Sequence, residues 1–121
     1  LATPTGATGY NLSAGGPLVV PGHDAMLLTP ICAHALAIRP LVVSPASVVE
    51  VRVEKGLEGM LLVVDGQVEE PLEVGDIVRV GRGDHRVALV VLEAGLWFER
   101  LRDTFRWGAR HDPAGADGAE C

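Results

Sequence analysis

The sequence predicts an all-β, mainly antiparallel domain, built as a distorted β-sandwich of many short strands. Three observations support this class. Apolar residues make up 48% of the chain and aromatic residues only 4%, so valine and leucine dominate, which favours strands. The apolar runs have the length of strands, and turn residues separate them every eight to twelve residues or so. The 121 residues are long enough for one domain with a small core.

The strands expected first follow a glycine-rich opening segment, Leu1–Pro17. They are short and lie between turns that contain proline, at 18–20, 25–29 and 41–43. Pro21-Gly22 is a turn signal between the first two, and Ser44-Pro45 ends the third. A short helix is also possible at 10–13, within the opening segment.

The middle of the chain gives the clearest strand signals. Residues 47–53 alternate between valine and charged side chains, as expected of a half-buried strand. Asp65-Gly66 is the dipeptide most typical of a two-residue hairpin turn, and apolar residues precede and follow it. The remaining strands are expected around these features, at 60–64, 67–70, 77–80 and 86–92.

Residues 96–107 depart from the strand pattern. Trp97, Leu101 and Phe105 recur every four residues, which predicts a short helix with an apolar face. Four of the five aromatic residues lie in this segment. Their face either caps the end of the core or packs against another domain or subunit. The tail that follows, 108–121, is rich in Ala, Gly and Asp, and we expect it to be disordered.

Composition excludes several classes of function. A net charge of −6 argues against nucleic-acid binding, which needs a basic surface. Two cysteines, Cys32 and Cys121, are too few for a disulfide framework and favour a reduced, cytoplasmic setting. No apolar run reaches the ~18 residues of a membrane span, and the first residues lack the pattern of a signal peptide. We therefore expect neither a nucleic acid nor a membrane as partner.

The opening segment concentrates glycines, small hydroxyl residues and one tyrosine, Tyr10. Such a composition is typical of a plain connector as well as of a loop that approaches a ligand closely. The segment is not a phosphate-binding P-loop, because that motif needs a lysine. Asp24 is the only charged side chain before Arg39, so the segment cannot neutralise a triphosphate by itself.

The order of residues decides between these readings. Thr3-Pro-Thr-Gly-Ala-Thr-Gly-Tyr10 is followed by Asn-Leu-Ser13-Ala-Gly-Gly-Pro17. Further on stand a Pro/His/Leu stretch at 30–42, which ends in Arg-Pro-Leu-Val, and the turn Asp65-Gly-Gln67. These stretches resemble the signature of the NAD kinase family, whose members depend on ATP or polyphosphate. The resemblance covers residues 1–107 in one register, with small changes at Ala7, Gly9 and Ala33.

The resemblance implies the NAD-binding C-terminal β domain, at 1–107, of an enzyme that phosphorylates the adenosine 2′-hydroxyl of NAD to give NADP. The family's Gly-Gly-Asp-Gly-Thr motif, which carries the catalytic aspartate, does not occur in the sequence. The Asn-Glu or Asn-Asp pair that binds the NAD ribose is also missing. We therefore expect the N-terminal α/β domain to be absent, no catalytic residue in this chain, and no activity of the chain alone. For the complete enzyme the resemblance implies Mg²⁺ and a homodimer or homotetramer.

The resemblance also implies which residues bind NAD: Thr5, Thr8, Gly9, Tyr10, Asn11, Leu12, Ser13 and Gln67. An uncharged loop of this kind suits the neutral groups of a dinucleotide, while backbone N–H groups, a metal or residues outside the chain meet the phosphates. Tyr10 is expected to pack against a base. The alternatives are structural: a buried tyrosine at a hinge, hydroxyls of Thr8 and Ser13 that cap a short helix, and a Gln67 that serves only its hairpin.

Other polar residues are expected to be structural. His34 is predicted to be packed rather than catalytic, Arg39 is predicted to have a structural role, and the four histidines lack metal-ligand spacing. Two other functions stay open: the C-terminal domain of a lipid or sphingoid-base kinase, and a non-enzymatic all-β interaction module. NAD binding that depends on Tyr10 would separate both from an NAD kinase.

Overall fold

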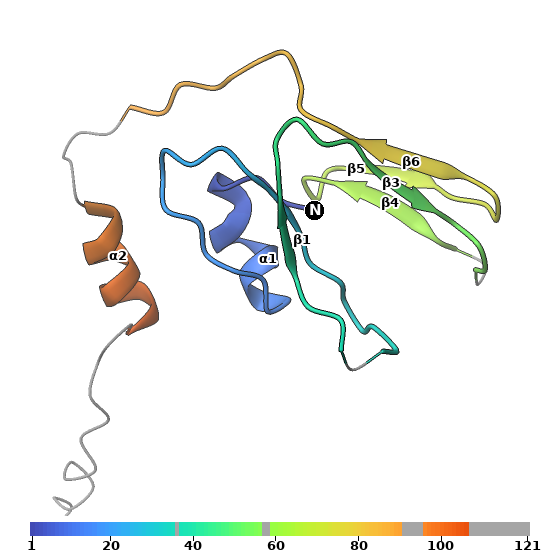
Figure 1. The fold of residues 1–121 in the computed structure, drawn as a ribbon, viewed down its shortest axis with the longest axis horizontal. Helices are drawn as coiled ribbons and strands as arrows, with labels where there is room; N and C mark the ends of the chain where they lie inside the picture. Colours follow the sequence, from blue (N-terminus) through green and yellow to red (C-terminus); the bar gives the residue numbers. More distant parts are fainter. Residues whose placement is uncertain (36, 57–58, 91–95, 107–121) are drawn as a thin grey trace, which may run out of the picture. The chain divides into compact units, whose positions relative to one another are not determined.

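The computed structural model describes residues 1–35, 37–56, 59–90 and 96–106 (Figure 1). The chain divides into two compact units, Leu1–Arg86 and Val87–Cys121. The strands of the first unit are β1 Met26–Leu28, β2 Leu41–Val43, β3 Val49–Arg52, β4 Leu61–Val64, β5 Val68–Pro71 and β6 Ile77–Val80. They pair as β1–β2, β3–β6 and β4–β5, and every pair is antiparallel. The predicted mainly antiparallel β class is confirmed.

The core of the first unit lies where the opening segment meets β1. Ala2 and Leu27 exchange two backbone hydrogen bonds, of 2.9 and 2.8 Å, so the start of the chain runs beside β1. The opening segment then forms a 3-10 helix, η1 (Thr5–Thr8), and one turn of α-helix, α1 (Tyr10–Ser13). Ala7 and Leu27 are fully buried and Met26 nearly so. These three are the buried apolar residues of the described chain.

A glycine pair ends α1. Gly15 adopts a positive φ of 81°, a conformation that costs glycine little. Its N–H donates to the Leu12 carbonyl at 2.9 Å, and the Gly16 N–H donates to the Asn11 carbonyl at 2.8 Å. This pair of bonds is the Schellman motif, which satisfies the last carbonyls of a helix and turns the chain sharply. The short helix expected at 10–13 is therefore confirmed, with a defined end.

The β4–β5 hairpin is inserted between β3 and β6. Asp65 and Gly66 have positive φ angles of 53° and 68°, as the predicted turn requires. The Gln67 N–H donates to the Val64 carbonyl at 3.0 Å, but the strands pair through Val64 and Val68. The connection therefore has three residues rather than two, and the strand expected to start at residue 67 starts at 68.

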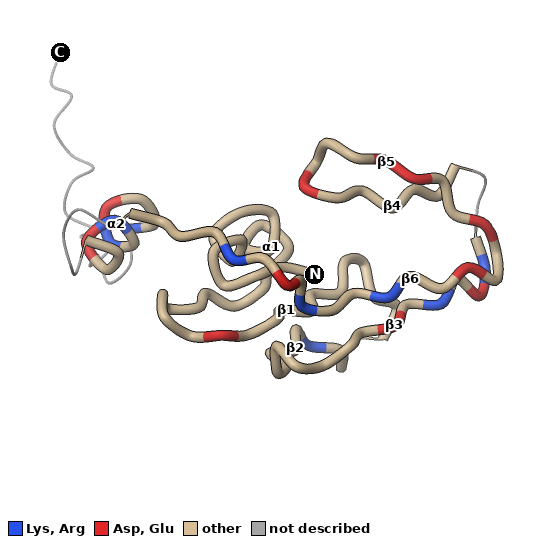
Figure 2. Tube along the Cα trace, turned by 90° about the horizontal axis from the view of Figure 1, so that it is seen from above, with Lys and Arg blue, Asp and Glu red and all other residues tan. Residues whose placement is uncertain are grey.

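Charges of both signs lie on β3 and β6 (Figure 2). Glu50 and Arg79 are direct cross-strand neighbours, and their side chains form an ion pair. Opposite charges at directly facing positions help to fix the register of two strands. Beyond β3, Val53 continues the ladder, because its N–H donates to the Asp76 carbonyl at 2.9 Å.

Two predicted strands are wrong. Residues 18–20 form no strand, because Pro17 and Pro21 enclose them and proline cannot donate to a ladder. Residues 86–90 form none either. Val87 and Val90 are 86% and 88% exposed. Residues 91 and 92 of that predicted strand, and the tail predicted to be disordered, lie outside the described residues.

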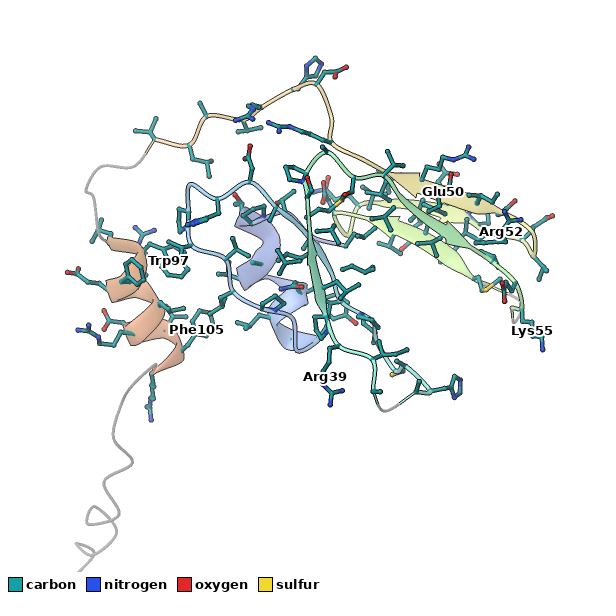
Figure 3. The ribbon with its side chains drawn as sticks, in the orientation of Figure 1. Arg39, Glu50, Arg52, Lys55, Trp97 and Phe105 are labelled. Atoms are coloured by element: carbon teal, nitrogen blue, oxygen red, sulfur yellow. The ribbon has the colours of Figure 1, made fainter. Side chains whose placement is uncertain are left out.

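The second unit contains the predicted helix, α2 (Leu96–Phe105). Trp97 and Phe105 are labelled on it in Figure 3. The Trp97 and Phe98 rings meet edge to face, with centroids 4.9 Å apart. Phe98 and Phe105 remain 56% and 42% exposed. Within the described parts of the chain, no helix is both long and apolar enough to cross a membrane.

Candidate functional site

The predicted site residues fall into two places. Seven of them are consecutive or nearly so, on η1, the junction residue Gly9 and α1. Gln67 lies in the turn between β4 and β5. These two strands form a different sheet from β1, the strand that the opening segment meets. The structure therefore brings the first seven together on one short segment and places Gln67 apart from them in the topology.

Tyr10 is the most exposed aromatic side chain of the described residues, at 74%. The alternative that it is a buried hinge tyrosine is wrong. An exposed ring with a hydroxyl at its tip can stack on a flat ligand and also form a hydrogen bond. Thr8 and Gly9, which precede it, are exposed as well. The segment thus offers a ring, a hydroxyl and an open stretch of backbone side by side.

The hydroxyls of the segment do not cap α1. Its N-cap is Gly9, which has no side chain, and no side-chain hydrogen bond caps this helix. Thr8 Oγ1 instead makes a long 3.5 Å contact to the Thr5 carbonyl. Thr3 Oγ1 accepts a hydrogen bond of 3.2 Å from the Gly6 N–H at the start of η1. Thr8 therefore does not cap α1, and the residue is exposed.

Asn11 differs from its neighbours because it is buried, with 8% exposure. Its Nδ2 donates to the carbonyls of Ala7, at 3.2 Å, and Pro17, at 3.0 Å. Its Oδ1 accepts a hydrogen bond of 2.6 Å from Thr29 Oγ1. Both N–H groups of the carboxamide are thus used within the chain. Of the predicted site residues, Asn11 is the one whose side chain is turned inward.

Sequence reasoning missed two residues that contact Asn11. One is Thr29, which directly follows β1, and the other is Gly16, whose position admits no side chain. A Cβ built on Gly16 would lie 2.6 Å from Asn11 Nδ2, so only glycine leaves room for the carboxamide. The signal that was available is chemical. A buried asparagine needs partners for its amide, and Thr29 is a hydroxyl residue beside the strand that the opening segment meets.

Charged groups lie beyond the opening segment. Asp24 accepts an ion-pair hydrogen bond of 3.1 Å from Arg86 and lies 3.4 Å from Arg82. These contacts join the turn after Pro21 to the loop after β6; Arg86 lies 62 residues from Asp24 in the sequence. The side chains are between 42% and 70% exposed, so water screens the interaction.

Other candidate residues are peripheral. His34 is exposed, so the prediction that it is packed is wrong. Arg39 donates to the neighbouring Ile38 carbonyl at 3.0 Å. Among the residues described, no three or more His, Cys, Asp or Glu side chains are grouped so that they could hold a metal ion.

The fold and the opening segment define a β-rich domain that displays an uncharged, hydroxyl-bearing loop with an exposed tyrosine. Residues 1–92 match the family model of the ATP-NAD kinase C-terminal domain. The chain belongs to this family. The resemblance inferred from the opening motif is thus confirmed.

Relatives agree with this assignment. The chain is 44% identical over 110 residues to the NAD kinase of Geobacter metallireducens and 43% identical over 118 residues to that of Gemmatimonas aurantiaca. These matches cover 91% and 98% of the chain but only 39% and 40% of the relatives. The chain therefore spans about two fifths of their length. The crystal structure of yeast NADH kinase complexed with NADH is similar, with a TM-score of 0.76 and 28% identity over 91% of this chain and 35% of that one.

Proposed function

We propose that the chain is the NAD-binding C-terminal domain of an NAD kinase that transfers a phosphoryl group from ATP or polyphosphate to the adenosine 2′-hydroxyl of NAD. The single observation that carries the proposal is the exposed ring of Tyr10 on a loop whose neighbours are uncharged. Family membership supports it, as does the likeness to an NADH kinase whose structure holds NADH.

The opening segment recognises the neutral groups of the dinucleotide. Tyr10 packs against a base, since stacking on an aromatic ring is a general way to hold one. Thr5, Thr8 and Ser13 supply hydroxyls that both donate and accept hydrogen bonds, and the bare backbone of Gly9 permits close approach. Half-buried Leu12 supports them from the helix, and Gln67 contributes a carboxamide from the β4–β5 turn.

The contribution of this domain to the reaction is to bind and orient NAD. Holding a hydroxyl in place for attack removes much of the entropic part of a barrier. The catalytic aspartate is expected in the N-terminal domain of the complete enzyme. Mg²⁺, when bound, neutralises charge on the transferred phosphoryl group.

The same proposal covers assembly and location. The complete enzyme is a cytoplasmic homodimer or homotetramer, with no nucleic acid or membrane as partner. Support comes from the net charge of −6 and from the apolar side chains that the described chain exposes, such as Val63, Val74 and Phe98. Burial of such side chains against another subunit would be favourable.

A calorimetric titration of NAD into the 121-residue chain tests the proposal. We expect measurable binding that weakens when Tyr10 is replaced by alanine. Binding that ignores Tyr10, or no binding at all, contradicts the proposal and favours an interaction module. Binding of a sphingoid base in place of NAD favours a lipid kinase.

A further inference from the structure

The Asn11 carboxamide joins α1 to three other parts of the first unit. Through Nδ2 it reaches the Ala7 carbonyl on η1 and the Pro17 carbonyl beyond α1. Through Oδ1 it reaches the hydroxyl of Thr29 at the end of β1. The three bonds measure 3.2, 3.0 and 2.6 Å, within or close to the usual range. One buried side chain therefore connects the opening segment to the strand beneath it.

The segment needs such a connection. A helix of four residues is unstable by itself, since short helices depend on tertiary contacts. No side chain caps the start of α1. Besides the carboxamide, the backbone bonds between Ala2 and Leu27 hold the segment to β1, but those lie before η1. Among the described residues, the hydrogen bond from the Thr29 hydroxyl to Asn11 is the one that links α1 itself to the residue after β1.

The orientation of Tyr10 follows from that of Asn11. Successive residues on an α-helix point about 100° apart, so the two neighbours cannot face the same way. Asn11 is held inward at 8% exposure, and Tyr10 projects outward at 74%. A rotation of α1 that exposed Asn11 would leave two N–H groups without their partners and would turn the tyrosine ring away from its present direction.

We propose that Asn11 and Thr29 are positioning residues for nucleotide binding: the hydroxyl–carboxamide pair fixes α1, and the bond to the Ala7 carbonyl fixes η1, so that Tyr10 and Thr8 are presented to NAD. The inference rests on the proposed function. It assigns Asn11 a different role from direct contact through its side chain, and it adds Thr29, which lies outside the opening motif. Neither side chain touches the ligand in this arrangement.

The composition of the chain makes a direct test possible. Asn11 is the only asparagine and Gln67 the only glutamine, so a ¹⁵N NMR spectrum contains signals of just two carboxamide NH₂ groups. Asn11 is buried and bonded, whereas Gln67 is exposed. In the free chain we expect the Asn11 NH₂ protons to exchange with water at least tenfold more slowly than those of Gln67, in line with the cost of opening a buried hydrogen bond. Equal rates would overturn the inference.

Substitutions at Thr29 link the network to binding. Thr29→Val removes the hydroxyl at nearly constant volume, and Thr29→Ser keeps it. In the complete kinase we expect Thr29→Val to raise the KM for NAD about 5- to 30-fold, the equivalent of one lost buried hydrogen bond. The kcat and the KM for the phosphoryl donor should stay within about twofold, and Thr29→Ser should restore the KM for NAD.

The outcomes separate this inference from the proposed function. If the unmodified enzyme does not phosphorylate NAD, the proposed function fails, whatever the exchange rates show. If it does, but Thr29→Val leaves the KM for NAD unchanged or lowers only kcat, the positioning role is wrong. If Thr29→Val unfolds the enzyme, two other measurements decide. Fast exchange of the Asn11 NH₂ protons in the unmodified chain overturns the inference. It is also overturned if Thr29→Ser loses the slow exchange of Asn11 but keeps its affinity for NAD.

Discussion

Gly16 lies directly against Asn11, so that any Cβ at position 16 would overlap the Asn11 carboxamide. Gly16→Ala must therefore displace the amide or shift the chain after α1. Overpacking of this kind costs about 1–3 kcal/mol, and we expect the midpoint of urea unfolding to fall accordingly. Gly83→Ala is the matched control, since a Cβ there meets nothing within 4 Å. Equal stabilities of the two variants would contradict the close contact.

Tyr10→Ala should weaken NAD binding to the chain by about 5- to 150-fold, which corresponds to the ~1–3 kcal/mol of one base–aromatic stack. Because the side chain is 74% exposed, the substitution should leave the free energy of unfolding nearly unchanged. Calorimetric titration measures the first effect and urea unfolding the second. Tyr10→Phe keeps the ring and should bind almost normally; if it binds as poorly as the alanine variant, the hydroxyl rather than stacking is responsible.

Asp24→Asn should lower stability by less than about 1 kcal/mol, although two arginines approach the carboxylate. Exposed ion pairs add little to the free energy of unfolding, and salt screens them further. Urea unfolding of both proteins at 0.05 M and 1 M salt checks this. The difference in free energy of unfolding between Asp24→Asn and the unmodified chain should be smaller at the higher salt concentration. A large, salt-independent loss would show that Asp24 has a role beyond its exposed ion pairs.

The 121-residue chain alone should bind NAD weakly and form no NADP. It lacks the Gly-Gly-Asp-Gly-Thr motif on which the family resemblance places the catalytic aspartate. Incubation with NAD, ATP or polyphosphate and Mg²⁺, followed by an enzymatic assay for NADP, measures this. The control is a complete NAD kinase in the same assay. Turnover by the chain alone would mean that it carries a catalytic group of its own.

The chain should self-associate through α2, because Phe98 and Phe105 are 56% and 42% exposed there. Sedimentation velocity should show species larger than the monomer, and Phe98→Ser combined with Phe105→Ser should shift them toward it. Thr104→Ser, on the same helix, serves as control because it removes only one methyl group. Monomers at all concentrations, with fully buried tryptophan fluorescence, would refute the prediction.

Local patterns predicted much of the fold. The alternation at 47–53 and the Asp65-Gly66 turn are properties of a few adjacent residues, and β3 and the β4–β5 hairpin form there. The recurrence of Trp97, Leu101 and Phe105 every four residues likewise predicted α2. The strand expected at 18–20 failed for a local reason, the prolines at 17 and 21, whereas the strand expected at 86–92 failed for a non-local one. An apolar run becomes a strand only where a partner pairs with it, and residues 86–90, the described part of that run, pair with no strand.

The sequence predicted which segment forms the candidate site, but not the buried hydrogen bonds of Asn11 inside it. The order of residues in the opening motif located the loop and its exposed tyrosine. The inward turn of Asn11 depends on Thr29, 18 residues further along, and on the space left at Gly16. A hydrogen bond between distant residues leaves no periodic trace in one sequence. Burial of the amide could be inferred only once the strand beneath it was known.

The pairing of strands in twos has a consequence for handling the protein. In the described chain, β2 to β6 each pair on one side only, so each presents a row of unpaired backbone N–H and C=O groups. Such edges invite strand addition by a second molecule. Glu69, Glu70 and Pro71 make β5 a poor template, because charge and proline oppose such pairing. Both β2, Leu41–Val43, and β4, Leu61–Val64, carry no charged residue, and β4 is the longer of the two. Fibrillar aggregation at high concentration should begin at β4, and a lysine at exposed Val63 should delay it.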